Sequence, residues 1–530
     1  MWRTTAMVVL AGTALAAGSA QAQGASSAEQ ARRCAALVGF VLPETDLQIS
    51  KAEAVPQAAP GTVRPSPFEP PLAVGVPSYC LVEGSFERRT GVGSKPYAIG
   101  FALALPDGWN GRFLFQGGGG LNGAVNPPLG AQAAGEAPAL ARGFAVVSTD
   151  SGHKGAVFDA SFMGDQKAEL NFAQESVGKV TLLARKIVTA YYGRPPIRSY
   201  FAGCSTGGRE AMLASERYPD LFDGVVAGDP AMRTGYSNVG LAWAAVAFNR
   251  AAPKDPSGKP LAAQLFPVGD KKLLVSSLLA ACDGLDGIKD GLIFNPGACR
   301  YDPAVLTCKA GKTDQCLTGA QVEALKTAVA GPRTTGGVQV YPGFVYDTGI
   351  GADGQGIPGF LPSSAPSILG PPNLSRQLDV DQAAAKVGAD GGQALIDTAT
   401  WTGLTAFFGH GGKILYYHGL SDPWFSPLDT VGYYQRLADA NGGDEAVRAS
   451  SRLFLVPGMG HCRGGAATLD QFDLLTAVVD WVEQGKAPDA VTATGASLPG
   501  LSRPLCPWPG HAQYKGAGDP KDAGSYACRT

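Results

Sequence analysis

The chain has 530 residues, of which 45% are hydrophobic and 17% charged, and its formal net charge at pH 7 is -2. This composition is typical of a globular protein with a sizeable buried core, and it excludes a disordered or fibrous chain. A net charge so close to zero provides no electrostatic attraction for nucleic acid or for an anionic membrane surface, so we expect neither as a partner.

The first segment of the chain predicts export. Arg3 precedes a short, alanine-rich apolar run, and Ala20-Gln21-Ala22 has the small-x-small pattern of a signal-peptidase site. A membrane anchor is the alternative, but the run is shorter than the ~20 apolar residues that span a bilayer. We therefore expect residues 1–22 to be a signal peptide and the mature protein to be secreted or periplasmic.

Export would place the ten cysteines in an oxidising compartment, where an even number indicates five disulfides. Short intervening segments favour three local pairs, Cys282–Cys299, Cys308–Cys316 and Cys506–Cys528. Spacing alone leaves open how the other four pair, namely Cys34, Cys80, Cys204 and Cys462.

Apolar runs bounded by glycine or proline predict the strands of one sheet. In chain order they are residues 97–106, 111–116, 144–150, 199–203, 224–228, 413–419 and 452–458. Most of the later runs are continuously apolar, as in strands buried on both faces of a parallel sheet. Helical spacing lies between them, from Val177 to Ile187 and from Phe472 to Val482. This alternation predicts an α/β fold with a mostly parallel sheet.

The alternation is lost between about residues 231 and 400, where glycine and proline interrupt the pattern and four cysteines lie. We expect this segment to be an inserted lid domain. The lid would separate two parts of one α/β core, residues 23–230 and 401–530.

A candidate nucleophile lies in the stretch AGCSTGGRE, residues 202–210. Gly203 to Gly207 fit the pattern G-x-S-x-G, between a predicted strand and a predicted helix, which is the context that a nucleophile elbow requires. An ordinary tight turn is the alternative. We interpret Ser205 as the nucleophile, at the start of the helix.

A serine nucleophile needs a base and an acid that orients the base, in the chain order serine, acid, histidine for an α/β-hydrolase. His461 follows the last predicted strand, and Asp422 lies in the turn after the preceding strand. The alternative for Asp422 is a structural role in a Ser-Asp-Pro turn, and the alternative for His461 is a histidine at the surface without a catalytic role. The order and the strand-end positions favour a Ser205–His461–Asp422 triad.

An acyl-transfer site also needs N–H donors for the oxyanion. One is expected from Thr206, the residue after the nucleophile. The glycine run at residues 117–120 supplies the second. We favour the N–H of Gly118, with Gly117 as the competitor and a flexible loop without a donor role as the alternative.

The cysteines next to the candidate nucleophile and the candidate base predict a further disulfide. If Ser205 and His461 come within hydrogen-bond reach, their neighbours Cys204 and Cys462 come close enough to be bridged. Cys34 and Cys80 then pair by elimination.

The motifs GCSTGGRE, SDPW and GMGHC, with cysteines beside Ser205 and His461, resemble those of the tannase and feruloyl esterase family of secreted serine esterases. The resemblance implies an α/β-hydrolase core, a lid, and hydrolysis of small-molecule esters of aromatic acids. It leaves the oligomeric state open.

A second site is predicted in residues 282–299, where Asp283, Asp286 and Asp290 lie in one tight loop. Three carboxylates so close together repel one another unless a hard cation such as calcium binds them, although a pair of Asp-Gly turns is the alternative. The resemblance implies a structural calcium ion here. It also implies that the carbonyls of Ile288 and Leu292 complete the ligand set.

The expected substrate pocket lies beside the acid. Trp424 and Phe425 follow Asp422 and can form a wall for an aromatic acyl group. The resemblance also places His418 and Phe425 in the pocket. In the family, the hydrolase of mono(2-hydroxyethyl) terephthalate uses a lid arginine for the substrate carboxylate, whereas residues 334–375 here contain no Lys or Arg.

We therefore expect neutral phenolic acyl groups, such as feruloyl, coumaroyl or galloyl esters, and the sequence does not choose between cinnamoyl and galloyl. Three alternatives remain: an esterase for the terephthalate monoester, a serine peptidase, and a catalytically inactive binding module on the same fold.

Overall fold

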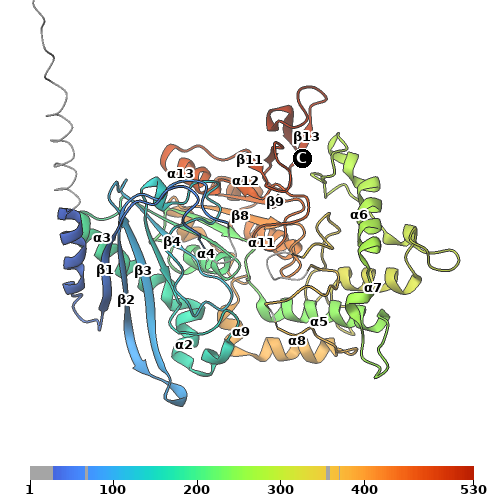
Figure 1. The fold of residues 1–530 in the computed structure, drawn as a ribbon, viewed down its shortest axis with the longest axis horizontal. Helices are drawn as coiled ribbons and strands as arrows, with labels where there is room; N and C mark the ends of the chain where they lie inside the picture. Colours follow the sequence, from blue (N-terminus) through green and yellow to red (C-terminus); the bar gives the residue numbers. More distant parts are fainter. Residues whose placement is uncertain (1–27, 66–69, 354–358, 369) are drawn as a thin grey trace, which may run out of the picture.

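The computed structural model describes residues 28–65, 70–353, 359–368 and 370–530, so the expected signal peptide, residues 1–22, lies outside the described residues. The main sheet has nine strands: β1 (Gln48–Val55), β2 (Tyr79–Thr90), β3 (Pro96–Pro106), β4 (Arg112–Gln116), β5 (Ala145–Thr149), β6 (Arg198–Cys204), β7 (Gly224–Gly228), β8 (Lys413–Gly419) and β9 (Ser451–Val456). Their order across the sheet is β1-β2-β3-β5-β4-β6-β7-β8-β9. Figure 1 shows β1, β2 and β3 on its left and β8 and β9 nearer its middle.

The sheet is antiparallel on one side and parallel on the other. Strands β1, β2, β3 and β5 pair antiparallel, and all pairs from β5 to β9 are parallel. The seven predicted strands are all present, and the α/β-hydrolase fold class is confirmed. The sequence analysis missed β1 and β2. Their polar composition, with Glu83, Glu87 and Arg88 on β2, hid them from a search for apolar runs.

Apolar residues on the two faces of the sheet form two separate cores. Phe113 and Phe115 of β4 face one core, while Leu114 faces the other, as the two-residue period of a strand requires. The first core is covered by α3 (Ser176–Tyr192), α4 (Thr206–Arg217) and α11 (Pro427–Ala440), and the second by α13 (Leu474–Gln484).

The helix predicted from Phe472 begins later than expected. Phe472 belongs to β10 (Gln471–Phe472), and the side chain of Asp473 accepts a hydrogen bond from the N–H of Thr476, which caps the start of α13. Both helices end at a glycine, because Gly193 and Gly485 adopt the left-handed conformation directly after α3 and α13.

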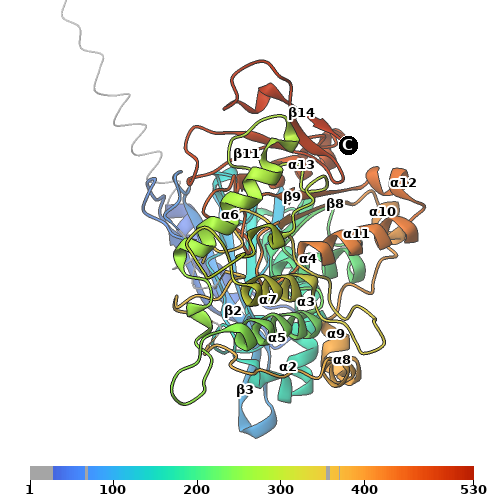
Figure 2. The same cartoon turned by 90° about the vertical axis from the view of Figure 1, so that its right-hand side faces the viewer.

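The described residues between β7 and β8 contribute no strand to the main sheet. They form α5 (Thr234–Ala251), α6 (Val268–Cys282), α7 (Gly319–Ala330), α8 (Val380–Ala389), α9 (Gly391–Ile396) and α10 (Thr405–Gly409). Figure 2 shows α5 and α7 side by side, and Phe248, Leu325 and Tyr341 lie in a third apolar cluster of their own. The lid boundaries at residues 231 and 400 stay a prediction.

The described chain also contains shorter elements. They include α2 (Gln166–Leu170), α12 (Asp444–Arg448), a small sheet of β10, β11 (Val491–Thr494) and β12 (Arg503–Leu505), and a hairpin of β13 (His511–Tyr514) and β14 (Tyr526–Arg529). Leu292 and Phe294 share a core with Leu505 and Tyr526 of these strands. The aspartate loop that the sequence analysis assigned to the lid therefore packs against the C-terminal strands.

All ten cysteines are paired, and the five disulfides are the five predicted ones: Cys34–Cys80, Cys204–Cys462, Cys282–Cys299, Cys308–Cys316 and Cys506–Cys528. Within the described part of the chain, no helix combines the length and the apolarity that crossing a bilayer requires.

Candidate active site

Four neighbouring parallel strands end at the same edge of the sheet, and each is followed by a chemically active side chain. Ser205 follows β6, Asp229 follows β7, Asp422 follows β8 and His461 follows β9. In open α/β sheets, this carboxyl edge is where ligands bind. The predicted strand-end positions thus bring the three triad candidates to one place, together with an aspartate that the sequence analysis did not single out.

Ser205 lies in a sharp turn between β6 and α4, with φ 62° and ψ -123°. Only close backbone packing holds a non-glycine residue in this conformation. A Cβ atom on Gly203 would come within 2.4 Å of the Gly207 carbonyl oxygen, and one on Gly207 within 2.7 Å of the Gly118 oxygen. The glycines around the serine are therefore required by packing, as a nucleophile elbow demands.

Asp422 and His461 form the acid–base pair that the sequence predicted. His461 Nδ1 lies 2.7 Å from Asp422 Oδ2, and both side chains are almost completely buried. Asp422 Oδ1 accepts hydrogen bonds from the N–H groups of Trp424 and Phe425, at 2.8 and 3.1 Å. The acid is thus held by its own turn and can fix the orientation of the imidazole.

Burial alone would raise the pKa of Asp422, but the charges and hydrogen bonds of His461 and His418 outweigh it and hold that pKa below its usual range. For His461, burial lowers the pKa, and the Asp422 carboxylate reverses this effect and leaves the pKa raised. The pair therefore favours an ionised acid beside a base that accepts a proton readily.

The other ring nitrogen of His461 is free to act. Nε2 is buried and makes no hydrogen bond to any described residue. The hydrogen bond between Nε2 and Ser205 that a triad requires is thus not formed in this structure, and such bonds often tighten only when a substrate binds. A buried, unpartnered nitrogen at this position can take the hydroxyl proton of the nucleophile.

The glycine loop after β4 departs from the prediction. The N–H of Gly118 donates to Glu210 Oε2 at 2.9 Å, and the N–H of Gly117 donates to the Ala202 carbonyl at 2.9 Å. Neither predicted donor is therefore free for an oxyanion, so the assignment of Gly118 is wrong for this geometry. The N–H of Gly119 makes no hydrogen bond to the described residues, and its α-carbon faces open space.

Thr206 lies where the sequence predicted the first oxyanion donor. It opens α4, so its N–H has no partner within the helix. The N-terminus of a helix also carries partial positive charge, which favours a developing anion.

Glu210 is a residue that the sequence analysis missed. It is fully buried on α4, and its carboxylate accepts hydrogen bonds from Asn122 Nδ2 at 2.6 Å and Ser151 Oγ at 3.1 Å in addition to the Gly118 N–H. Its partners are 92, 88 and 59 residues away, so no local motif could reveal them. Glu210 fixes the glycine loop relative to the nucleophile helix.

Aromatic side chains surround the base. Trp424 and Phe425 stack with ring centroids 5.5 Å apart, and each ring centroid lies 5.4 Å from that of His461. Phe158, from the segment that follows β5, lies 5.4 Å from Trp424. The structure thus places the two predicted pocket residues at the site and adds Phe158, which the sequence analysis missed because it is distant in the chain.

His418 does not line a pocket, and this prediction was wrong. Its side chain is fully buried, with Nδ1 2.8 Å from Thr430 Oγ1 and Nε2 3.0 Å from the Phe425 carbonyl oxygen. Proximity in sequence to Asp422 did not determine its direction, because side chains on a strand alternate between faces. His418 lies inside the protein, next to the acid.

A small depression beside His461 is lined in part by a cationic side chain, that of Arg463. Its lining includes Gly349, Asp353, Gly460 and Arg463. The sequence analysis searched only residues 334–375 for a cation and so overlooked Arg463, which follows the base by two residues.

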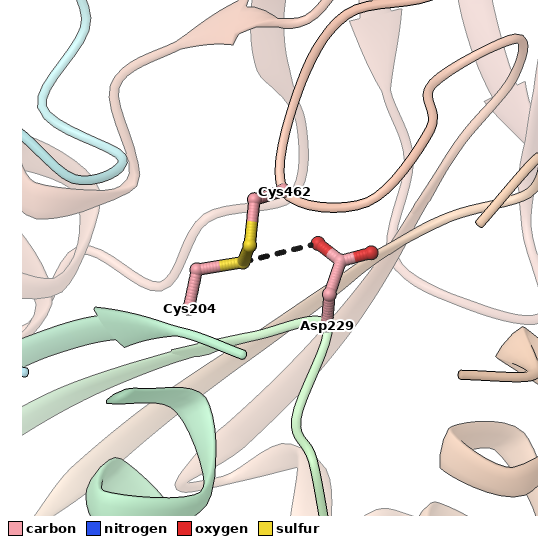
Figure 3. A group of neighbouring side chains, drawn as sticks. All are labelled: Cys204, Asp229 and Cys462. Atoms are coloured by element: carbon pink, nitrogen blue, oxygen red, sulfur yellow. Dashed lines mark hydrogen bonds between the residues drawn. A yellow bond between two sulfur atoms is a disulfide. The ribbon is translucent and has the colours of Figure 1, made fainter. Parts of the chain in front are cut away.

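The Cys204–Cys462 disulfide joins the nucleophile elbow to the base loop, with a Cα–Cα distance of 5.9 Å across 258 residues (Figure 3). In the chain-entropy model, closing so long a loop stabilises the fold by about 5 kcal/mol. Cys462 itself has φ 66°, so the covalent bond also restrains a strained residue next to the base.

The aspartate loop offers the carboxylate oxygens that a divalent cation prefers, but the structure does not bring the three carboxylates together as one ligand set, so the calcium site stays a prediction. Asp283 and Asp286 are buried, and burial together with the neighbouring carboxylates raises the pKa of Asp286 to about 6. The guanidinium of Arg503 pairs with the carboxylate of Asp290. The carboxylates stand apart, each accepting hydrogen bonds from N–H groups of the loop.

Comparison with known proteins places these features in context. The family model described as "Tannase and feruloyl esterase" matches residues 80–359 and 372–529. Mono(2-hydroxyethyl) terephthalate hydrolase of Piscinibacter sakaiensis is 37% identical over 520 residues, which cover 86% of this chain and 85% of the relative. A probable feruloyl esterase of Arthroderma benhamiae is 31% identical over 499 residues, covering 88% and 87%.

Among solved structures, feruloyl esterase B from Aspergillus oryzae has a TM-score of 0.74 and 26% identity, and the similarity covers 94% of this chain and 100% of that one.

The disulfide beside the site generates a prediction. We expect the double variant Cys204→Ala, Cys462→Ala to lose activity about tenfold or more, because the base loop is no longer held against the elbow, and to melt at a lower temperature. The variant Cys308→Ala, Cys316→Ala, which opens a short and distant loop, is the matched control and should keep its activity. A first variant as active as the wild type would show that the bond is not needed for catalysis.

Proposed function

We propose that this chain cleaves esters of phenolic aromatic acids through Ser205, His461 and Asp422. The chain belongs to the tannase and feruloyl esterase family and is therefore a carboxylic ester hydrolase. The observation that carries this proposal is the 2.7 Å contact between His461 and Asp422, with the other imidazole nitrogen left without a partner at the edge where the strained Ser205 lies.

The reaction that these residues support has two steps. Ser205 Oγ attacks the ester carbonyl carbon while His461 Nε2 takes the hydroxyl proton, and Asp422 stabilises the resulting imidazolium. The tetrahedral intermediate collapses, and the alcohol leaves with the proton from His461. Water then attacks the acyl-enzyme with the same base, which releases the acid and restores Ser205.

The oxyanion of each intermediate needs two N–H donors. We assign one to Thr206, at the start of α4. The second is assigned to Gly119 rather than Gly118, because Glu210 already accepts the Gly118 N–H. Glycine at this position allows the backbone to approach the substrate closely.

The acyl pocket is assigned to Phe158, Trp424 and Phe425. Their rings lie at the base, and an aromatic acyl group would pack against them. We propose neutral phenolic acyl groups as the preferred class, because the lid residues 334–375 supply no cation for a substrate carboxylate. The terephthalate monoester named for the Piscinibacter relative is the second candidate, which Arg463 beside His461 favours.

We also propose that Asp283, Asp286 and Asp290, with the carbonyls of Ile288 and Leu292, hold one structural calcium ion. Calcium would supply positive charge that these carboxylates lack, and it would order the loop against the C-terminal strands. Secretion is proposed as well, and the five disulfides support it because they form and persist in oxidising compartments.

The triad assignment predicts a graded loss of activity. Ser205→Ala and His461→Ala should each lower kcat for a phenolic ester by about a thousandfold or more, with the fold unchanged by circular dichroism. Asp422→Ala should leave more residual activity, because the acid only orients and stabilises the base. A folded Ser205→Ala protein that keeps a few per cent of the wild-type rate would refute the assignment.

The same assignment predicts a pH dependence. His461 must be neutral to accept a proton, so kcat/KM should fall as the pH drops through the pKa of His461. Because that pKa is raised, the midpoint of the acidic limb should lie above the ordinary histidine value of about 6.5.

Substrate class can be tested with three esters in one buffer. We expect kcat/KM for methyl ferulate or methyl gallate to exceed that for mono(2-hydroxyethyl) terephthalate, because residues 334–375 supply no cation to offset the cost of desolvating the substrate carboxylate. If the terephthalate monoester is favoured tenfold or more, the proposed class is wrong. Loss of that preference in Arg463→Gln would then identify Arg463 as the cation.

The calcium assignment can be tested by its removal. Dialysed protein should contain about one calcium per chain, and chelation should lower the melting temperature more than it lowers turnover at moderate temperature. Asp286→Asn should reduce calcium content, whereas Asp302→Asn, at an exposed position nearby, should not. Absence of calcium, or an unchanged melting temperature on chelation, would contradict the site.

A further inference from the structure

A second acid and a second histidine lie directly behind the triad. His418 Nε2 is 3.4 Å from Asp422 Oδ2 and 3.6 Å from Asp229 Oδ1. All three side chains are completely buried, and the proposed reaction uses neither Asp229 nor His418. Buried ionisable groups are costly unless they are paired, so this arrangement requires an explanation.

The backbone aims Asp229 at the centre of the site. Asp229 has φ 36°, a strained value for a residue other than glycine, and its Oδ1 accepts the N–H of Gly419 at 2.9 Å. Figure 3 shows its carboxylate directed at the disulfide, with Oδ2 3.5 Å from Cys204 Sγ. Strain of this kind persists only where the surroundings fix it, and it concentrates at functional sites.

The contacts of His418 suit a protonated ring. Nε2 faces three acceptors, namely the two carboxylates and the Phe425 carbonyl, and Nδ1 faces the Thr430 hydroxyl, which can accept a hydrogen bond. Burial lowers the pKa of His418, but the carboxylates of Asp229 and Asp422 outweigh it and leave the pKa raised. Burial raises the pKa of Asp229 to about 7, which the charge of His418 opposes.

We propose that Asp229 and His418 form a buried ion pair that positions the Asp422–His461 couple and balances its charge. His418 is then a positioning residue: its imidazolium lies between the two carboxylates, allows both to be ionised in a dry environment, and keeps Asp422 available to His461. Asp229 in turn holds His418 in its protonated form. This inference rests on the proposed triad.

The pair acts on His461 with opposite signs. The negative charge of Asp229 favours the imidazolium of His461, whereas the positive charge of His418 disfavours it. Among the described residues, the ionisable groups whose charges act on the pair are Asp422 and His461. Removing one partner therefore leaves the other uncompensated, and the two removals should shift the protonation of His461 in opposite directions.

The experiment is the pH dependence of kcat/KM for methyl ferulate in three variants of the full chain. Asp229→Asn should move the acidic limb to lower pH, because Asp422 still keeps His418 charged at 3.4 Å. His418→Asn should move it to higher pH, because it removes the imidazolium charge that disfavours protonation of His461, while Gly419 still donates to Asp229 Oδ1 at 2.9 Å. Each shift should be about half a pH unit or more, and the double variant should return towards the wild-type limb.

Asp347→Asn is the matched control. Asp347 is also buried, and it joins the loop of Asp422 to the loop of His461 through Ser421 Oγ at 2.6 Å and the Gly458 N–H at 2.7 Å. Among the described residues it contacts no imidazole. This variant should change stability or kcat and leave the limb in place. A purely structural role for Asp229 and His418 would produce the same result in their variants.

A measurement on the wild-type protein covers the case in which a variant fails to fold. Nitrogen-15 NMR of labelled histidine should find both ring nitrogens of His418 protonated at pH 7. A neutral His418, or single variants whose limbs coincide with that of the wild type, would overturn the ion pair. The proposed function fails separately, if Ser205→Ala remains active while the limbs shift as expected.

Discussion

The parallel pairing of β6, β7, β8 and β9 is the constraint on which the rest of the site depends. Because these strands run in the same direction, their carboxyl ends meet at one edge, although the residues that follow them are spread from Ser205 to His461. The chain places Ser205, Asp229, Asp422 and His461 there, one after each strand, and three of them are the proposed nucleophile, acid and base. The strand order alone brings these side chains to one edge. Their orientation there depends on how firmly the loops that carry them are fixed.

Local strain and a covalent bond hold these loops. Ser205, Asp229 and Cys462 have φ values of 62°, 36° and 66°, and all three lie around one disulfide. The Cys204–Cys462 bond fixes the nucleophile elbow to the base loop, and the carboxylate of Asp229 packs against its sulfur atoms. Such strain is kept only where packing and bonds over-determine the backbone, and here it lies on both sides of the disulfide that joins the Ser205 turn to the His461 loop.

Much of this could be predicted from the sequence because its signals are local. Apolar runs between glycines marked the parallel strands, and the order of Ser205, Asp422 and His461 marked the candidate triad. The pairing of Cys204 with Cys462 then followed from the expected contact between their neighbours, and the structure confirms it. The polar strands β1 and β2 escaped the same search because their composition is that of a solvent-exposed surface.

What could not be predicted depends on side-chain direction and on distant partners. His418 was assigned to the pocket because it precedes the acid, yet its side chain is directed into the interior. Gly118 was favoured as a donor, but Glu210 from another element accepts its N–H. Asp229 follows a strand whose end carries no recognisable motif. It lies next to His418 because β7 pairs with β8 in the folded sheet.

The central claim is that an acyl group passes through Ser205. The most direct test is mass spectrometry of protein quenched during turnover of a slowly hydrolysed phenolic ester, followed by digestion and mapping. The account predicts that the mass of one acyl group appears on the peptide that contains Ser205 and disappears as substrate is exhausted. An acyl group on a different residue, or turnover without any acylated peptide, would contradict it.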